Sequence, residues 1–455
     1  MINRKFPPVP DSEIPFEKPN IQRFNVGDSL EILHVQKNNL PIVYSELILD
    51  AGSKFDLETL GGTANLTSLL IDEGAAEFTS LQLSEQFEKL GTVFQVNADT
   101  DTLNFSILSL SEYFERSIEL LSKVLFEPRF SQADFDREKK KVLDKITQLK
   151  DNPSYTASTV FEKILFKDTF YEFPEIGYYN SVLNIKRDDI LSFYENRTLK
   201  SKMILIVVGN VGKSDLEILI NKYFAGKSRT SISSQPMNDI FLPSPKNKFY
   251  LVHKEDSTQS ELRIGHSSFK RNSPDFPASK IMNTILGGQF SSRINLNLRE
   301  KRGITYGATS SFHFYINSGW FEISTSVNVD NTGEAVSEIF KEIKGIKESI
   351  LDSEIEFSKS TIIKQFPSRF ETYSQIARNI ETVALHSLQF SDLFEHPNQI
   401  ANTNNDEVRS AAQKHVKPEE AVVVIVGDRS KVISQISSIS NNIIELTEEG
   451  ELLRK

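Results

Sequence analysis

Two short apolar runs decide the organisation of this chain: MILIVVGN at Met203–Asn210 and AVVVIVGD at Ala421–Asp428. Each run is rich in β-branched residues and ends in Gly plus a small polar residue, which is typical of a buried strand that ends in a turn. An acidic, helix-like stretch precedes each run at a similar distance. The distance is 20 residues from Asp189 to the first glycine and 21 from Asp406 to the second. The pattern predicts a duplicated domain.

The two copies lie about 217 residues apart, close to half of the chain. Between them, the segment 225–246 is rich in Ser, Pro, Lys and Asn and has no sustained apolar period, as expected for a linker. We therefore expect an N-terminal domain at residues 1–224, a linker at 225–246 and a C-terminal domain at 247–455.

Strands and helices are mixed within the first half. Apolar periodicity predicts strands at Ile42–Ala51, Val93–Val96 and Thr102–Leu108, and helices at Gly61–Glu73, Leu81–Leu90, Phe114–Leu125 and Ser131–Leu149. Ser131, with Asp134 three residues on, is expected to cap the last helix. This order predicts an α+β fold in which each half is a mostly antiparallel sheet with helices packed on one side.

Composition narrows the classes of partner. The net charge of −10 argues against nucleic acid and anionic membranes, which require a basic face, and leaves room for basic or extended peptides. The chain has no cysteine, which excludes disulfides, thiolate nucleophiles and Cys–zinc sites.

Targeting signals are also absent from the sequence as it stands. Met1–Ser12 is Pro-rich and polar, without an apolar core of signal-peptide length, and no run of about eighteen apolar residues occurs. We expect a soluble, cytoplasmic protein without a membrane partner. A periplasmic location is the alternative, because a signal peptide could have been removed.

The segment GGTANLTSLL at Gly61–Leu70, preceded by Ala51–Lys54 and closed by Gly74, resembles the first helix of pitrilysin-type (insulinase-type) zinc peptidases. In that family the helix carries His-x-x-Glu-His, whose two histidines bind zinc and whose glutamate is the general base. On this chain the first His position is Asn65, the Glu position is Ser68 and the second His position is Leu69.

The resemblance also places the third zinc ligand, a Glu about 76 residues further on, at Lys145 in the stretch Glu138–Lys145. An ammonium group repels zinc and cannot bind it. With Asn65, Ser68 and Leu69, all four functional positions of the motif are therefore substituted. None of the seven histidines lies between residues 35 and 252, and no Gly-x-Ser-x-Gly elbow occurs. We expect this chain to hold no metal or other cofactor and to be inactive as a peptidase alone.

A second motif is retained. LGGQFSSRINLNLREKRGITYGA at Leu286–Ala308 is similar to the family's C-terminal-domain signature, in which an Arg and a Tyr seven residues apart reach the substrate. Here they are Arg299 and Tyr306. A guanidinium can grip a peptide carbonyl or carboxylate, and a Tyr hydroxyl can donate to a developing oxyanion. We expect Gly303 to end the helix of Arg299 and Tyr306 to lie on the next strand. The alternative interpretation is that the four consecutive charged residues, Arg299–Arg302, form a solvated helix end.

Asn97-Ala98 also matches the family, where an Asn-Ala pair lies on the edge strand that pairs with substrate backbone. The match is two residues long. An ordinary turn near Asp99 and Asp101 fits the same residues.

The resemblance extends from about Phe24 to Gly427 and implies two domains that face each other, clam-like, around a central cavity. Some family members are heterodimers in which one subunit holds zinc and the other supplies the Arg/Tyr pair. The resemblance thus implies a non-catalytic, substrate-binding subunit that acts on peptides with a zinc-bearing homologous subunit, or with a second copy of itself.

The α subunit of mitochondrial processing peptidase has a similar role, in which its partner subunit holds the zinc. Its long glycine-rich loop is reduced here to Gly287–Gln289. The alternative is an inert scaffold or peptide-binding protein, like core subunits of respiratory complexes.

Overall fold

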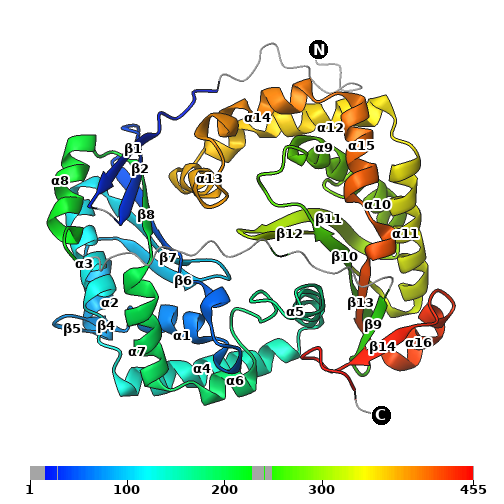
Figure 1. The fold of residues 1–455 in the computed structure, drawn as a ribbon, viewed down its shortest axis with the longest axis horizontal. Helices are drawn as coiled ribbons and strands as arrows, with labels where there is room; N and C mark the ends of the chain where they lie inside the picture. The colour runs from blue at the N-terminus through cyan, green and yellow to red at the C-terminus, as the bar shows by residue number, and fades with distance from the viewer. Residues whose placement is uncertain (1–15, 28, 228–239, 241–247, 454–455) are drawn as a thin grey trace, which may run out of the picture.

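The computed structural model describes residues 16–27, 29–227, 240 and 248–453. Its N-terminal half contains a six-stranded sheet of order β1-β2-β8-β3-β7-β6 (Figure 1). The strands are β1 (Gln22–Val26), β2 (Leu30–Gln36), β3 (Ile42–Leu49), β6 (Val93–Ala98), β7 (Leu103–Leu110) and β8 (Met203–Gly209). β4 (Gly74–Ala75) and β5 (Phe78–Thr79) form a separate short hairpin.

The C-terminal sheet also has six strands, in the order β11-β12-β10-β13-β9-β14. They are β9 (Lys248–His253), β10 (Gln259–Ser268), β11 (Thr305–Tyr315), β12 (Ser318–Asn328), β13 (Val422–Gly427) and β14 (Ile443–Leu446). Five strands of each sheet follow one order, with β2-β8-β3-β7-β6 matched by β9-β13-β10-β12-β11. In both sheets the first of these pairs is parallel and the others are antiparallel. The predicted duplication is confirmed, and the two decisive runs form the equivalent strands β8 and β13.

Helices surround the two sheets (Figure 1). They are α1 (Thr63–Leu70), α2 (Ser80–Lys89), α3 (Phe114–Phe126), α4 (Gln132–Lys150), α5 (Pro153–Leu165), α6 (Tyr179–Asn184), α7 (Arg187–Asn196), α8 (Lys213–Phe224), α9 (Phe276–Leu286), α10 (Arg293–Asn295), α11 (Thr332–Glu348), α12 (Asp352–Gln365), α13 (Tyr373–Leu385), α14 (Phe390–Asn402), α15 (Asn405–His415) and α16 (Arg429–Ser437). The predicted elements of the first half are all present within a few residues. Ser131 caps α4 as expected, because its hydroxyl accepts a hydrogen bond from the Asp134 amide at 3.2 Å. None of the helices in the described ranges is long and apolar enough to cross a membrane.

The continuous apolar run of β8 reflects burial on both faces of its sheet. Leu205 and Val207 point to the core that the sheet shares with α1 and α3, whereas Ile206 and Val208 belong to a second apolar cluster on the opposite face. A strand that is covered on both sides has no solvated face and therefore needs no polar alternation.

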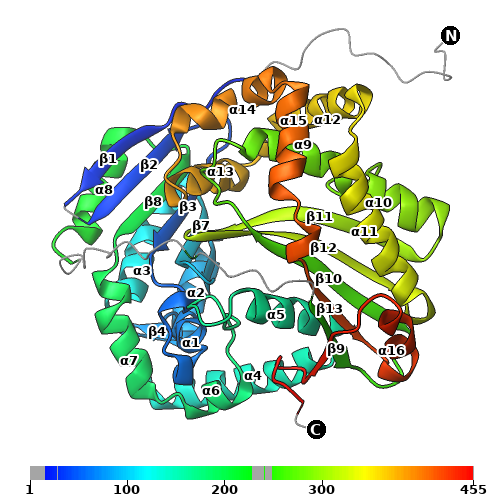
Figure 2. The same cartoon turned by 45° about the vertical axis from the view of Figure 1, so that its right-hand side comes forward.

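In each sheet, the face opposite its own helices is covered by a helix from the other half of the chain. α13, from the C-terminal half, packs on β8 and β3, where Ile376 and Ile380 join Ile206. Reciprocally, α5 packs on β13 and β10, where Phe161 meets Val424. Figures 1 and 2 show both helices beside the sheet of the opposite half. The predicted α+β halves are confirmed. The sequence predicts helices on one side of each sheet, and in the structure the opposite side is also covered, by α13 in the N-terminal sheet and by α5 in the C-terminal sheet.

Polar contacts also connect the halves. The Asp101 carboxylate, in the β6–β7 turn, accepts hydrogen bonds from the Ile316 amide at 2.8 Å and the Tyr171 hydroxyl at 2.9 Å. Arg263 on β10 donates to the Ser154 hydroxyl on α5 at 2.7 Å. Most of the predicted linker, residues 225–246, lies outside the described residues. α8 ends at Phe224 and β9 begins at Lys248.

Candidate functional site

Helix α1 carries three of the four positions where the zinc motif would lie. Gly62 precedes the helix with φ of 100°, and the half-buried Asp56 carboxylate accepts from the backbone amides of Gly62 at 2.8 Å and Ala64 at 2.9 Å. The Ser68 hydroxyl donates back to the Asn65 carbonyl at 2.7 Å, and the Leu69 side chain is 37% exposed. The helix is well formed, and the side chains at the three positions are an amide, a hydroxyl and an isobutyl group.

The fourth position, Lys145, is exposed on α4, which packs against α1. The buried carboxylate of that helix, Glu138, is already engaged by Arg137 at 3.0 Å and Lys141 at 2.7 Å. In the described ranges no three His, Cys, Asp or Glu side chains gather as a metal would require. The residues at the four family positions do not fit zinc, because none is a histidine, carboxylate or thiolate.

Arg299 lies on a π-helical turn, Leu296–Lys301, that continues α10. The Arg302 amide donates to the Asn297 carbonyl at 3.1 Å, which closes the wide turn, and the Asn297 amide group donates to Glu338 at 2.8 Å. Leu298 is fully buried, while Arg299 is half-exposed, with Cζ 4.1 Å from the centre of the Phe290 ring. π turns of this kind often occur at functional sites, because the wider turn changes where a side chain points.

Arg302 also supports this turn. Its Nε donates to the Asn297 carboxamide oxygen at 2.9 Å, and its guanidinium forms ion pairs with Glu334 and, at 2.7 Å, with Glu338 on α11. These contacts fix the Arg302 side chain within this chain. The four consecutive charged residues are not one solvated face, because Arg302 is a structural anchor and Arg299 is not.

Tyr306 lies in a β-bulge near the start of β11. The register with β12 shifts between Thr305 and Ala308, which leaves one extra residue on β11. Two hydroxyls stabilise the bulge: that of Thr305 accepts from the Gly307 amide at 3.1 Å, and that of Thr325 donates to the Gly307 carbonyl at 2.9 Å. The Tyr306 side chain is 91% exposed. A bulge re-aims a side chain and is common beside active sites.

The glycines before this segment have a packing role. A Cβ on Gly287 would lie 2.5 Å from the Ser310 hydroxyl oxygen, and one on Gly288 would lie 2.9 Å from the Asn283 side chain. The Gly287 carbonyl accepts from the Ser310 amide at 3.1 Å. Only glycine allows the end of α9 to approach β11 this closely. As predicted, Gly303 ends the turn, with φ of 66°, and Tyr306 lies on the following strand.

Asn97 and Ala98 are the last two residues of β6, which is an edge strand of the N-terminal sheet. They pair with Asn104 and Leu103 of β7, and the Asn97 side chain is exposed. The turn begins only at Asp99. β6 and β11 occupy equivalent edges of the two sheets, so Asn97, Ala98 and Tyr306 all lie on edge strands.

Comparison with known proteins agrees with this architecture. Residues 32–175 match the profile described as Insulinase (Peptidase family M16), and residues 184–362 match Peptidase M16 inactive domain. The chain is a two-domain protein of the zinc-peptidase fold without its zinc ligands. It belongs to the insulinase family, peptidase family M16, as an inactive member.

Relatives and solved structures cover most of the chain. An uncharacterized zinc protease of Rickettsia bellii is 24% identical over 75% of this chain and 82% of its own length. The non-peptidase homolog YmxG of Helicobacter pylori is 22% identical over 88% of this chain and 92% of its own. A crystal structure of a peptidase M16 inactive domain from Pseudomonas fluorescens has a TM-score of 0.82, with 24% identity, and covers 90% of this chain and 98% of that one.

Proposed function

We propose that this chain is the non-catalytic, substrate-binding subunit of a heterodimeric zinc peptidase that acts on peptides or unfolded segments. The observation that carries the proposal is the presentation of Tyr306, almost fully exposed on a bulge held by two threonine hydroxyls, beside Arg299 on a π turn. An exposed aromatic ring on an irregular, hydroxyl-braced edge favours contact with another molecule over packing in this chain.

The two side chains have complementary chemistry. When water adds to a peptide carbonyl, negative charge grows on the carbonyl oxygen, and the Tyr306 hydroxyl can donate a hydrogen bond to it. Arg299 presents a planar fork that can hold a neighbouring carbonyl of the substrate. The zinc-bearing partner would supply the metal that activates the water, since Asn65, Ser68, Leu69 and Lys145 do not fit that ion here.

Substrate backbone has a place to bind. β6 and β11 are sheet edges, and an extended peptide can add to such an edge through main-chain hydrogen bonds. Asn97 and Ala98 on β6 are the residues that we propose for this pairing.

The test is reconstitution. The purified chain is analysed for metal and assayed with a quenched fluorescent peptide, alone and with a homologous chain from the same genome that carries His-x-x-Glu-His. We expect less than stoichiometric zinc and no cleavage from this chain alone, and a stable heterodimer that cleaves the peptide. One zinc per purified chain would overturn the proposal.

A heterodimer whose activity equals that of the zinc-bearing chain alone would also overturn the proposal. That result would favour the alternative, an inert scaffold of the same fold. Self-association to an active homodimer would exclude the need for a second gene product. The cytoplasm is the compartment that we propose for the complex, which fractionation of cells would check.

A further inference from the structure

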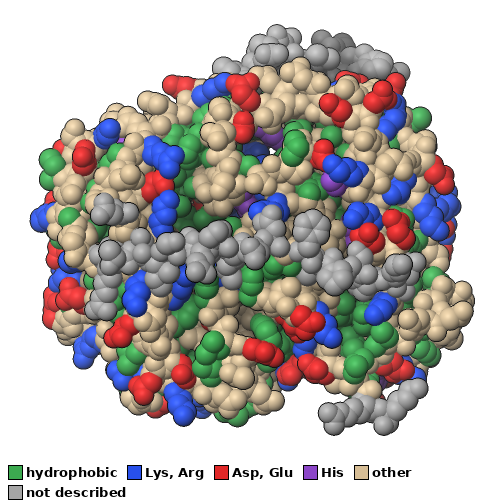
Figure 3. Space-filling view, viewed as in Figure 1, with side chains coloured by type: hydrophobic (Ala, Val, Ile, Leu, Met, Phe, Trp, Pro, Cys, Tyr) green, Lys and Arg blue, Asp and Glu red, His purple; other side chains and the backbone are tan. Residues whose placement is uncertain are grey.

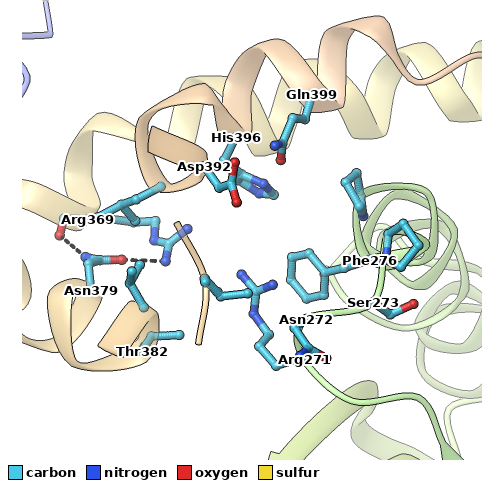
Figure 4. Close-up of a pocket in the computed structure, with 15 residues that line it drawn as sticks. Arg271, Asn272, Ser273, Phe276, Arg369, Asn379, Thr382, Asp392, His396 and Gln399 are labelled. Atoms are coloured by element: carbon cyan, nitrogen blue, oxygen red, sulfur yellow. Dashed lines mark hydrogen bonds between the residues drawn. The ribbon is translucent and has the colours of Figure 1, made fainter. Parts of the chain in front are cut away.

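The C-terminal half contains a pocket of about 360 Å³ that the Arg/Tyr site does not use. It lies between the connection from β10 to α9 on one side and helices α13 and α14 on the other (Figure 4). Phe314, near the end of β11 remote from Tyr306, packs on Phe276 at the pocket wall, with ring centres 5.9 Å apart. Eight residues along a strand correspond to roughly 26 Å, so the pocket is distinct from the Arg299–Tyr306 site.

Two guanidinium groups project into this space from segments almost one hundred residues apart. Arg271 comes from the connection before α9, and its Cζ lies 3.5 Å from the centre of the Phe276 ring. Arg369 comes from the turn before α13 and donates to the Asn379 carboxamide oxygen, which orients it. Figure 4 shows both groups in the same cavity, with His396 and Asp392 on the opposite wall.

The basic side chains of the pocket are not neutralised by ion pairs within the described residues. No carboxylate in the described part of the chain forms an ion pair with Arg271, Arg369 or the nearby Lys280. Burial and the charge of Arg369 lower the pKa of Arg271 to about 10, and burial lowers the pKa of His396 to about 4, with Arg369 adding to the effect. Burial and the charges of Arg369 and Arg271 lower the pKa of Lys280 as well. Arg271, Arg369 and Lys280 therefore repel one another, in a chain whose net charge is −10.

Repulsion of this kind costs stability in the free protein, so a bound anion would relieve it. Figure 3 shows acidic and basic side chains intermixed on the face in view, whereas two arginines gather in this pocket. The carboxylate of Asp392 also lines the pocket, where it tempers the total positive charge and favours a ligand with one negative charge over one with two or three.

Part of the remaining wall is apolar, beside the polar side chains of Asn272, Ser273, Asn379, Thr382 and Gln399. Val383, Leu388 and Leu393 line the pocket together with the Phe276 ring and two prolines, Pro274 and Pro277. A simple inorganic anion would leave these surfaces in contact with water. An apolar group attached to the anion would bury them, with about 25 cal/mol gained per Å² of apolar surface.

We propose that this pocket binds a carboxylate attached to an apolar body, such as the C-terminal residue of a peptide. The planar forks of Arg271 and Arg369 match the two oxygens of a carboxylate, and the apolar walls accept the side chain of the terminal residue. The proposal concerns this chain alone and stands without a zinc-bearing partner.

Thermal unfolding of the purified full chain tests the pocket. The probes are N-acetylphenylalanine, its amide, and inorganic phosphate, compared at equal ionic strength. A ligand that binds only the folded state raises the unfolding temperature, and at a hundredfold excess over Kd we expect the free acid to raise it by on the order of 5 °C. The amide, which lacks the charge, should cause no shift.

Variants separate binding from folding. Arg271→Gln and Arg369→Gln should each weaken the acid's affinity by at least about tenfold. Free Arg271→Gln should unfold at the wild-type temperature or above it, because a repulsion is removed, and it keeps the test decisive if loss of the Asn379 hydrogen bond destabilises Arg369→Gln. Arg271→Lys should bind with intermediate affinity, since the charge stays and the fork is lost. The exposed Lys167→Gln, in the other half, should behave as wild type.

Three results would overturn the proposal. Equal shifts from the acid and the amide would mean that the charge is not recognised. A phosphate shift as large as that of the acid would indicate an inorganic or phosphoryl anion site. Full binding by both glutamine variants would show that the guanidinium groups face the cavity for another reason.

Discussion

Tyr306 exposes 91% of its side chain, whereas Arg302, four residues before it, forms ion pairs with two glutamates of α11. A single sequence motif thus contains both an almost fully exposed side chain and one that fixes the backbone. Arg299 lies between these extremes, stacked on Phe290 with its guanidinium edge accessible. These differences give each residue a separate experimental signature.

Tyr306→Phe should lower kcat of the reconstituted heterodimer by about 10²–10³, because the loss of one oxyanion donor typically has that effect. The phenyl ring keeps the shape of the bulge, so the thermal stability and the dimer Kd should stay unchanged. Peptide cleavage and analytical ultracentrifugation measure the two quantities. The exposed Lys301→Ala, on the same turn, is the matched control and should retain wild-type rates. A Tyr306→Phe heterodimer as active as wild type would contradict the proposed role.

Arg302→Ala should destabilise the isolated chain by about 1–3 kcal/mol, because it leaves Glu338 and the Asn297 carboxamide without their guanidinium partner. Denaturant unfolding measures this loss, and Lys301→Ala again serves for comparison. Any loss of activity in the heterodimer should follow from disorder of the π turn, and should be rescued in part by Arg302→Lys. Unchanged stability would show that these ion pairs are fully replaced by water.

At the scale of elements, the most informative contact is that of α13 with β3. Glu381 on this helix feels the charges of Glu46 on the strand and of Asp99, and Arg378 offsets them in part. Burial, followed by the charges of Glu46 and Asp99, raises the pKa of Glu381 from 4.5 to about 8. Exchange of the helix between the halves therefore brings a carboxyl group into a site where its ionised form is disfavoured.

The sign of the resulting pH dependence follows from linkage. Between pH 4.5 and about 8 the folded chain keeps a proton that the unfolded chain has released, so the stability falls as the pH rises through this window. Glu381→Gln should flatten the fall and make the variant more stable than wild type at pH 8–9. Urea unfolding from pH 5 to 9 measures it, with the exposed Glu371→Gln as control. Parallel profiles for wild type and Glu381→Gln would contradict the assignment.

How far the sequence could predict these elements depends on how local their causes are. β8 and β13 could be predicted, because a β-branched run that ends in Gly indicates a buried strand wherever it packs. The helical pattern of α13 could be detected as well, but amphipathicity does not say which sheet the apolar face will cover. The bulge at Tyr306 depends on Thr325 of the neighbouring strand, and the pocket depends on Arg271 and Arg369, so neither has a local signal in the sequence.

At the scale of the whole molecule, the exchange of α5 and α13 makes each half incomplete without the other. Two aromatic and aliphatic clusters, one on the second face of each sheet, are built from both halves. The Asp101 carboxylate and Arg263 add polar contacts across the same boundary. The two halves repeat one another in strand order, but their cores are not independent, so we expect them to unfold together.

Ile376→Ala tests this cooperativity. The side chain is fully buried between α13 and the N-terminal sheet, so truncation should cost about 2–5 kcal/mol of unfolding free energy. Because the helix belongs to one half and the sheet to the other, differential scanning calorimetry should show one transition that moves to lower temperature as a whole. Ile218→Ala, on α8 and 69% exposed, is the control and should leave the transition in place. A second, separate transition in Ile376→Ala would mean that the halves fold independently and that the exchanged helices are only docked on their surfaces.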